Sequence, residues 1–444
     1  MIIKNGKVAL PGHNKLKSLD IRLEKGRISE IGPDLQDNEV IDARGLHIFP
    51  GAIDPHVHFN EPGFTEREDF YHGSSASVSG GVTTVIDMPC TSLPPVTSLD
   101  NLQHKLKIVQ KKSVIDFGFF GGVSGQSYSN RQKYMDELSD WVLGFKTYFI
   151  SGMDSFQQLD HYQFLQVLKY SEKVERPILL HAEDFSYVNT AEIVESKKGS
   201  SWTNYYNSRP EVAELMAVEN ALAMAGKTDA ELHIVHLGTS AAARLLTGHN
   251  NISGETAPHY LEFNTGDLKK IGGALKTAPV VKPEGNSEQL WNLLENNRIN
   301  FIASDHAPAP ADQKNTGSAW KDYAGIPGSG TLFPYLYSEG LRKREISLSS
   351  FLRIVAEGAA RRYGIFDRKG SIETGKDGDL IFLDPDSHWT VKGRDFYSKG
   401  KVTPFENKRL EGRIEKTMIR GQVVYDRKEG IIQQPGYGQF IKHD

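Results

Sequence analysis

The sequence has little that would tie it to a membrane, to nucleic acid or to an oxidising compartment. Cys90 is the single cysteine among 444 residues, which excludes an intramolecular disulfide. No apolar run approaches the roughly 20 residues that a membrane-spanning helix requires. The formal net charge of -4 leaves no basic excess to attract nucleic acid. The first residues also lack the apolar core of a signal peptide, and we expect a cytoplasmic enzyme.

Short strand patterns occupy both ends of the chain. Residues 1–49 contain several of them, separated by hairpin signals such as Asn5-Gly6. Similar patterns return after Gly375, at 379–383, 414–419 and 422–425. A β unit as small as residues 1–49 cannot bury a core alone. We therefore predict that residues 1–49 and 375–444 form one composite β-sandwich.

Residues 50–374 follow another rhythm, in which apolar strands alternate with helices. A helical stripe is clear at 99–109, residues 211–225 are strongly helical and stop at Gly226, and a trailing helix is indicated at 347–363. Eight strands alternating with helices over about 300 residues predict a (β/α)8 TIM barrel, a mixed α/β fold. The expected strands are 48–59, 82–88, 115–121, 142–149, 178–181, 232–237, 252–257 and 299–304.

A histidine pair stands at the end of the first expected strand, in the stretch PGAIDPHVHFNEPG. Alternate side chains of a strand point to one face, so His56, His58 and then Asn60 should project together. Two neutral imidazoles on one face favour a divalent cation. The alternative is an ordinary core strand with an incidental histidine pair.

Further metal-competent side chains end other strands of the expected barrel. Taken singly, each of these side chains could equally belong to an ordinary hydrogen-bonded residue of the core or of a loop. In a TIM barrel, however, the carboxyl ends of all strands meet at the rim that carries the active site. The coincidence favours a metal site built from His56, His58, Lys146, His181, His236 and Asp305.

Lys146 needs its own account, because an ammonium cannot bind a metal. Apolar neighbours and nearby cations lower the pKa of a lysine, and a neutral amine adds carbon dioxide to form an anionic carbamate. Such a group bridges two metals. Metal coordination lowers the pKa of water from about 15.7 to roughly 7. Asp305 can take the proton and pass it to a leaving nitrogen, which predicts amide hydrolysis.

Over essentially its whole length the chain resembles the cyclic amidohydrolases, a group that contains allantoinase, dihydroorotase and dihydropyrimidinase. The motifs that carry the resemblance are PGAIDPHVHFNEPG, GGVTTVIDMP, GFKTYF, HAED, HIVHLGTS, ETAPHYL and ASDHAP. The resemblance implies two metal ions, usually zinc. It implies that His56 and His58 bind one ion, that His181 and His236 bind the other, and that carboxylated Lys146 bridges them. Asp305 would be both ligand and base.

Members of this group differ in their substrate contacts. Dihydroorotases place an arginine where this chain has Asn60, an asparagine where it has Ala278, and a histidine where it has Ala309. The HVHFNEPG stretch and the segments 88–95, 151–156 and 207–210 look like allantoinases. Departures from allantoinases occur at Thr91, at Thr147-Tyr148 and in the PGSGT stretch at 327–331.

The pattern predicts a small cyclic ureide as substrate, most simply allantoin hydrolysed to allantoate in purine catabolism. Contacts are expected from Asn60 and from the backbone near Ala278 and Gly325. One alternative is a dihydroorotase that holds a carboxylated ring through Lys276 or Lys282. Others are a dihydropyrimidinase or hydantoinase, and a non-enzymatic scaffold, which the complete ligand set disfavours. The resemblance suggests a homodimer or homotetramer, and we expect Cys90 to be a packed residue at the rim.

Overall fold

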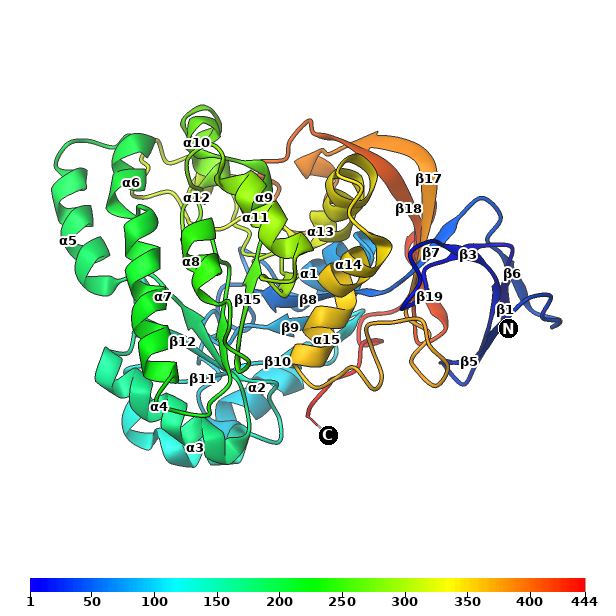
Figure 1. Cartoon of the computed structure of the whole chain (residues 1–444), viewed down its shortest axis with the longest axis horizontal. Helices are drawn as coiled ribbons and strands as arrows, with labels where there is room; N and C mark the ends of the chain where they lie inside the picture. The colour runs from blue at the N-terminus through cyan, green and yellow to red at the C-terminus, as the bar shows by residue number, and fades with distance from the viewer. Residues whose placement is uncertain (444) are drawn as a thin grey trace.

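Within residues 1–443, which the computed structural model describes, eight parallel strands form a closed barrel (Figure 1). Asp444, the last residue of the expected sandwich segment, lies outside the described residues. The barrel closes where Val57, at the end of the first strand, bridges His306, beyond the last. The strands are β8 (Ala52–Val57), β9 (Val82–Asp87), β10 (Asp116–Phe119) continued by β11 (Gly121–Gly122), β12 (Phe145–Tyr148), β13 (Ile178–His181), β14 (Leu232–Ile234), β15 (Ile252–Thr256) and β16 (Phe301–Ile302).

The apolar character of these strands follows from burial on both faces. All residues of β8, β9, β12 and β13 are buried. In a TIM barrel one face of each strand fills the interior and the other packs against helices, so the sequence shows apolar runs instead of alternation. The predicted barrel is confirmed.

The first expected strand, 48–59, is wrong as a single element. It is divided at Gly51 into β7 (His47–Pro50), which leaves the barrel, and β8. A Cβ atom at Gly51 would lie 2.1 Å from Oγ1 of Thr83, so only glycine allows this close approach. The strand also ends before Asn60, whose φ is +56°. A left-handed residue breaks the alternation that was expected to align Asn60 with His56 and His58.

Helices surround the barrel. The predicted helices at 99–109 and 211–225 are present as α2 and α7, and the trailing helix forms α14, η4 and α15 in succession. The α-helices are α1 (Phe70–Ser79), α2 (Leu99–Val109), α3 (Arg131–Leu138), α4 (His161–Val174), α5 (Phe185–Ser196), α6 (Trp202–Ser208), α7 (Glu211–Ala225), α8 (Ser240–Leu245), α9 (Pro258–Glu262), α10 (Thr265–Ile271), α11 (Asn286–Glu295), α12 (Ala311–Lys314), α13 (Ser329–Tyr335), α14 (Leu348–Leu352) and α15 (Gly358–Arg362). Two π-helical segments, η3 (Leu336–Lys343) and η4 (Arg353–Glu357), and short 3-10 turns, η1 (Tyr128–Asn130), η2 (Gly272–Leu275) and η5 (Gly393–Asp395), complete them.

Two further sheets lie beside the barrel. One has the order β5-β4-β1-β6 and the other the order β20-β19-β18-β17-β7-β2-β3. The strands are β1 (Ile2–Lys4), β2 (Lys7–Val8), β3 (Lys17–Ser18), β4 (Asp20–Glu24), β5 (Arg27–Gly32), β6 (Val40–Asp42), β17 (Leu380–Thr390), β18 (Arg409–Ile419), β19 (Gln422–Asp426) and β20 (Gly430–Ile431). β17 and β18 run longer than the sequence suggested.

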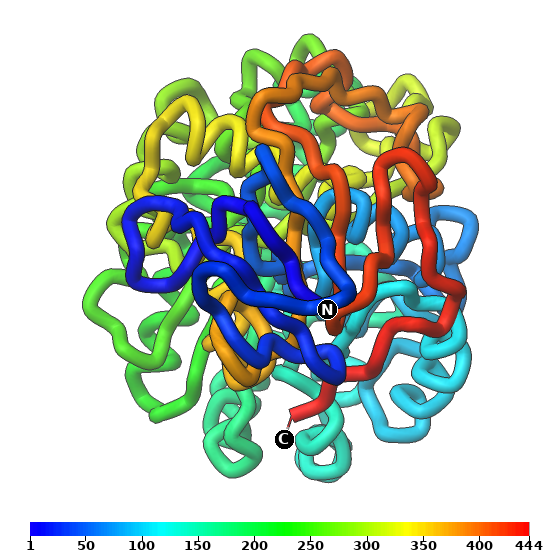
Figure 2. The backbone as a smooth tube through the Cα atoms, turned by 90° about the vertical axis from the view of Figure 1, so that its right-hand side faces the viewer, coloured from blue at the N-terminus to red at the C-terminus, as the bar shows by residue number. Residues whose placement is uncertain are grey.

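The segments before and after the barrel share one sheet, as their adjacent traces show (Figure 2). β7 pairs antiparallel with β17, so Phe49 lies opposite Ile381. Apolar residues from both ends, including Ile21, Ile48 and Phe382, form one buried cluster between the sheets. The first expected boundary, between residues 49 and 50, falls inside β7. The division into two domains stays a prediction.

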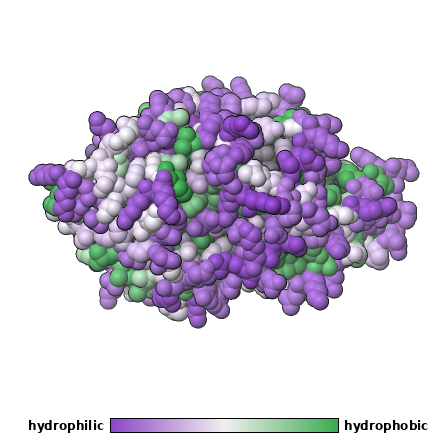
Figure 3. Space-filling view, turned by 90° about the horizontal axis from the view of Figure 1, so that it is seen from above, coloured by the Kyte–Doolittle hydropathy of each residue, from purple (hydrophilic) through white to green (hydrophobic). Residues whose placement is uncertain are grey.

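The surface offers no broad apolar face in the view of Figure 3, where hydrophobic residues appear in small separate groups. Scattered apolar residues of this kind are normal on a protein surface. Among residues 1–443, no helix has both the length and the apolar character needed to cross a membrane.

Candidate metal centre

The barrel brings the six predicted ligands to one rim. His56 belongs to β8, Lys146 to β12, and His181 is the last residue of β13. His58, His236 and Asp305 follow the ends of β8, β14 and β16 within a few residues. Because parallel strands end on the same side of the barrel, these positions converge although they are distant in sequence.

Donor atoms from these residues lie within a few ångström of one another. Oδ1 of Asp305 is 3.3 Å from Nε2 of His56 and 3.4 Å from Nε2 of His58. These three residues place their ligand atoms within 4.8 Å of one another, the spacing of a metal site. On the other side, Nδ1 of His181 is 3.0 Å from Nε2 of His236. The ring centroids of His56 and His236 are 5.3 Å apart, so the two groups are neighbours.

Backbone hydrogen bonds fasten the first ligands to the last. The His306 amide donates to the His56 carbonyl at 3.2 Å, and the His58 amide donates to the His306 carbonyl at 2.8 Å. Asp305 directly precedes His306 and has φ of +50°, and His236 has φ of +39°. Left-handed backbone at residues other than glycine costs roughly 1–3 kcal/mol each and is common at functional sites.

Polar partners orient the imidazole rings. Nδ1 of His56 is 2.5 Å from Glu255, whose other oxygen is 3.2 Å from Nε2 of His233. Nε2 of His181 is 3.0 Å from Glu183. A neutral imidazole has one N–H and one acceptor nitrogen, so donation to a carboxylate fixes the tautomer. The acceptor nitrogens of His56 and His181 therefore face inward, toward the other ligands.

Burial favours the neutral form of three of the four rings. It lowers the pKa of His56 and of His236 well below the usual value and also lowers that of His181. At His58 burial also lowers the pKa, but the neighbouring Cys90 and Asp305 outweigh it and raise the value to about 10. Burial opposes ionisation of Asp305, but the neighbouring histidines outweigh it and hold the Asp305 pKa well below its ordinary range. Neutral imidazoles and an ionised carboxylate are the forms that bind metal.

Among the predicted metal ligands, Lys146 stands out by the hydrogen bonding of its amine. It is fully buried, and its Nζ finds no hydrogen-bond partner among the described residues. Burial lowers its pKa to about 8. The charge of Lys146 in turn adds to burial in lowering the pKa of His56, His181 and His236. A buried amine without a partner beside imidazole and carboxylate donors fits a metal centre that the amine joins in modified form.

A cavity of 260 Å³ opens onto the ligands. The predicted contacts Ala278 and Gly325 line it. Asn60 does not, and this expectation needs correction. Its side chain is buried and donates to the His58 carbonyl at 3.0 Å, because the left-handed backbone turns it into the wall. Asn60 therefore supports the loop that carries His58 and does not face the cavity.

Other lining residues were not anticipated from the sequence. Thr91, Tyr148, Arg209 and Tyr323 all line the cavity. Cys90 is buried at the rim, as expected, but it also faces the cavity, with Sγ 3.0 Å from the Tyr148 hydroxyl. The HAED and NSRP motifs contain Glu183 and Arg209, but their sequence gave no sign that the two side chains would meet.

The two lysines proposed as carboxylate contacts lie outside the cavity lining. Nζ of Lys276 donates to the carbonyls of Trp320 and Asp322, and Lys282 pairs with Glu214 at 3.4 Å. Both ammonium groups are therefore engaged by the protein itself.

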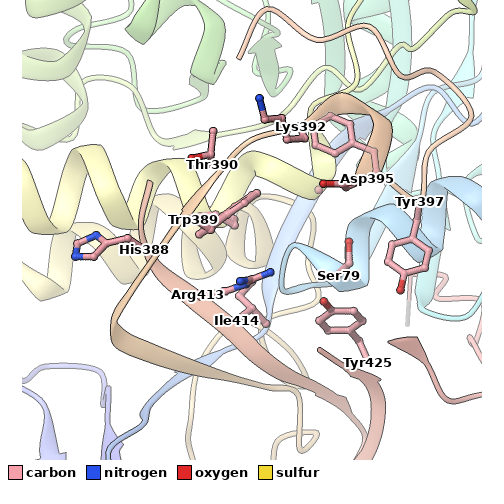
Figure 4. A pocket seen from close by; sticks show the side chains of 13 residues that line it. Ser79, His388, Trp389, Thr390, Lys392, Asp395, Tyr397, Arg413, Ile414 and Tyr425 are labelled. Carbon is pink, nitrogen blue, oxygen red and sulfur yellow. The ribbon is translucent and has the colours of Figure 1, made fainter. Parts of the chain in front are cut away.

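A second cleft, of 490 Å³, lies where the sandwich meets α1 and α13. The side chains of Trp389, Tyr397, Arg413 and Tyr425 surround it (Figure 4). No predicted site residue is among the described residues that line this cleft. It is separate from the metal centre.

Comparison with known proteins agrees with this geometry. The model of the amidohydrolase family matches residues 47–424. An allantoinase from Rubrobacter xylanophilus is 33% identical, covering 100% of this chain and 97% of its own. An allantoinase from Salmonella choleraesuis is 32% identical, covering 100% and 99%.

Solved structures resemble the chain over its whole length. An L-hydantoinase (dihydropyrimidinase) from Arthrobacter aurescens superposes with a TM-score of 0.94 at 28% identity, covering 100% of this chain and 99% of its own. A dihydropyrimidinase from Brevibacillus agri gives 0.92 at 26% identity, with coverage of 100% and 98%. With its metal-competent rim and these full-length matches, the chain belongs to the amidohydrolase family and is a hydrolase of cyclic amides.

Proposed function

We propose that this hydrolase binds two zinc ions and opens the ring of allantoin to give allantoate. The observation that carries the metal proposal is the buried, unpartnered amine of Lys146 beside two groups of inward-facing donor atoms. His56 and His58 would hold one ion, and His181 and His236 the other. Asp305, close to both His56 and His58, would be a further ligand.

Lys146 joins this centre as a carbamate. Its neutral amine attacks carbon dioxide, an N–C bond forms, and one proton is released to solvent. The pKa of about 8, lowered by burial, makes the neutral amine accessible near physiological pH. The product is an anion with two oxygens, which suits a bridge between cations. Carboxylation thus converts Lys146 from a cation into an anionic ligand.

The side chains of the protein transfer the proton and orient the metal ligands. When bound, the metal ions supply Lewis acidity and make water acidic enough to attack at neutral pH. Asp305 is ionised, so that it can receive the proton from the attacking water. It then returns this proton to the ring nitrogen as the amide C–N bond breaks. Glu255 and Glu183 hold the histidine tautomers throughout.

The charge of the cavity favours a neutral ring. Arg209 is the one arginine among the described lining residues, and lysine is absent from them. Its guanidinium pairs with Glu183 at 2.6 Å and with Glu192 at 3.0 Å. Within the described cavity wall, therefore, no arginine or lysine is left unpaired to bind a substrate carboxylate. This disfavours dihydroorotate as the substrate. The two allantoinase relatives add support for allantoin.

A hydantoin or dihydropyrimidine is the second candidate, favoured by the TM-score of 0.94 to the Arthrobacter hydantoinase. Steady-state assays of the zinc-loaded enzyme with allantoin, hydantoin, dihydrouracil and dihydroorotate separate the candidates. We expect the highest kcat/KM for allantoin. A higher kcat/KM for hydantoin or dihydrouracil would identify the second candidate as the substrate class. Turnover of dihydroorotate alone would refute both candidates. The oligomeric state and cytoplasmic location stay predictions.

A further inference from the structure

Arg209 occupies an unusual position in the cavity. It follows directly after α6 (Trp202–Ser208) and extends to the wall beside the metal ligands. Its side chain is 13% exposed, so the guanidinium is largely shielded from solvent. Arg209 takes no part in the proton transfers proposed for hydrolysis. Desolvating a guanidinium costs free energy unless partners compensate the charge. The position of this cation at a substrate cavity therefore suggests a function.

Two carboxylates fix the guanidinium from one side. Nη1 donates to Glu183 at 2.6 Å, while Nε and Nη2 donate to Glu192 at 3.2 and 3.0 Å. A guanidinium has five N–H groups, and these three bonds use three of them. The planar fork cannot rotate without losing these bonds. Arg209 is thus held rigidly, with donor capacity left over.

The same carboxylate oxygen ties Arg209 to the metal centre. Oε2 of Glu183 accepts from Arg209 and also lies 3.0 Å from Nε2 of His181. The distance between Arg209 and the imidazole of His181 is therefore set by one shared atom.

We propose that Arg209 is a specificity-determining residue that donates a hydrogen bond to a substrate carbonyl oxygen other than that of the amide being cleaved. The inference rests on the proposed cyclic ureide substrate and deepens it. Because Glu183 and Glu192 neutralise the guanidinium, its free N–H groups suit a neutral carbonyl better than a carboxylate. Its rigid link to His181 holds that carbonyl at a fixed distance from the metal centre, which orients the ring for attack.

The recognition is selective because the donor is desolvated. A buried N–H that loses its acceptor keeps the full penalty of desolvation, so a substrate without the second carbonyl is rejected. A cyclic ureide carries more than one carbonyl, whereas a simple lactam carries only the one that is cleaved. The site would accordingly discriminate against lactams.

The test uses the zinc-loaded Arg209→Lys variant. Lysine keeps a positive charge beside Glu183 but lacks the planar fork and its free N–H groups. Losing one hydrogen bond to a charged group should raise the KM for allantoin about ten- to a hundredfold, with a smaller change in kcat and with zinc content unchanged. Arg244→Lys, on the outer helix α8, is the matched control and should keep the KM of the wild type.

Inhibition of the wild-type holoenzyme gives a second readout that does not depend on folding of a variant. Hydantoin, which has two carbonyl groups, should compete with allantoin at least tenfold more tightly than 2-pyrrolidinone, a lactam with one carbonyl group. Unchanged KM in Arg209→Lys, or equal inhibition by the two compounds, would overturn the proposal. A wild type that turns over no cyclic ureide would instead refute the proposed function, so the two failures are distinguishable.

Discussion

Nε2 of His56 lies 3.3 Å from Oδ1 of Asp305, although His56 belongs to the first strand of the barrel and Asp305 follows the last. The hydrogen bonds that join them pass through His306 and are those that close the barrel. Closure of the barrel and the geometry of the metal centre therefore depend on the same hydrogen bonds. A substitution that weakens these hydrogen bonds should affect metal binding before it affects the outer helices.

Glu255 is expected to control metal affinity without touching the metal. It accepts from His56 and His233 and is fully buried between them. In Glu255→Gln the amide offers one acceptor oxygen where the carboxylate offered two, so the tautomer of His56 is no longer fixed. Zinc affinity, measured by competition with a chelator, should fall about 10- to 100-fold. The exposed Glu219→Gln on α7 is the control, and equal affinities in both variants would contradict this role.

Asp305 should matter more for turnover than for folding. Its side chain is at the rim and contributes little to the apolar core. Asp305→Asn removes the proton acceptor, and kcat should fall about 10²–10⁴-fold. The melting temperature of the metal-free protein should change little by comparison. An unchanged kcat would show that another group moves the proton.

Cys90 should tolerate a small substitution but not a large adduct. Its thiol is 3.0 Å from the Tyr148 hydroxyl, and serine can keep that hydrogen bond. Cys90→Ser is therefore expected to retain activity close to that of the wild type. Iodoacetamide should inactivate the wild type, because the adduct projects into a cavity of only 260 Å³, and should spare Cys90→Ser. Full alkylation of Cys90 without loss of activity would contradict its placement in the cavity wall.

Asn60→Arg tests the correction made by the structure. If Asn60 faced the cavity, arginine there would create a carboxylate contact and improve the use of dihydroorotate. Because Asn60 is fully buried, we expect no gain and a loss of stability of about 3 kcal/mol or more from an unpaired buried charge. Denaturant unfolding and a dihydroorotate assay measure the two effects. A stable variant that gains dihydroorotate turnover would restore the original expectation.

The sequence identified those features that depend on local pattern. Strands such as β9 were recognisable because both of their faces are buried, and α7 because a run of helix-favouring residues ends at Gly226. The ligands were recognisable because metal-competent side chains stood where apolar strands ended. These signals need no knowledge of how distant segments pack.

Features that depend on tertiary packing were not predictable. Nothing local indicated the break at Gly51, which arises because β7 pairs with β17 more than 300 residues later in the chain. The positive φ of Asn60 reverses its side chain relative to a regular strand. Arg209 enters the cavity only because α6 ends beside β13, where Glu183 is available as its partner.

Crystallography of the zinc-loaded enzyme, with anomalous data collected at the zinc edge, would show directly whether two metal ions are joined by a modified Lys146. Two anomalous peaks are expected, with nitrogen atoms of His56 and His58 about 2.0–2.1 Å from one and those of His181 and His236 at the same distance from the other. Electron density for a carbamate should extend from Nζ of Lys146 between the peaks. A single peak, or an unmodified Lys146 directed away from both, would refute the proposed two-metal centre.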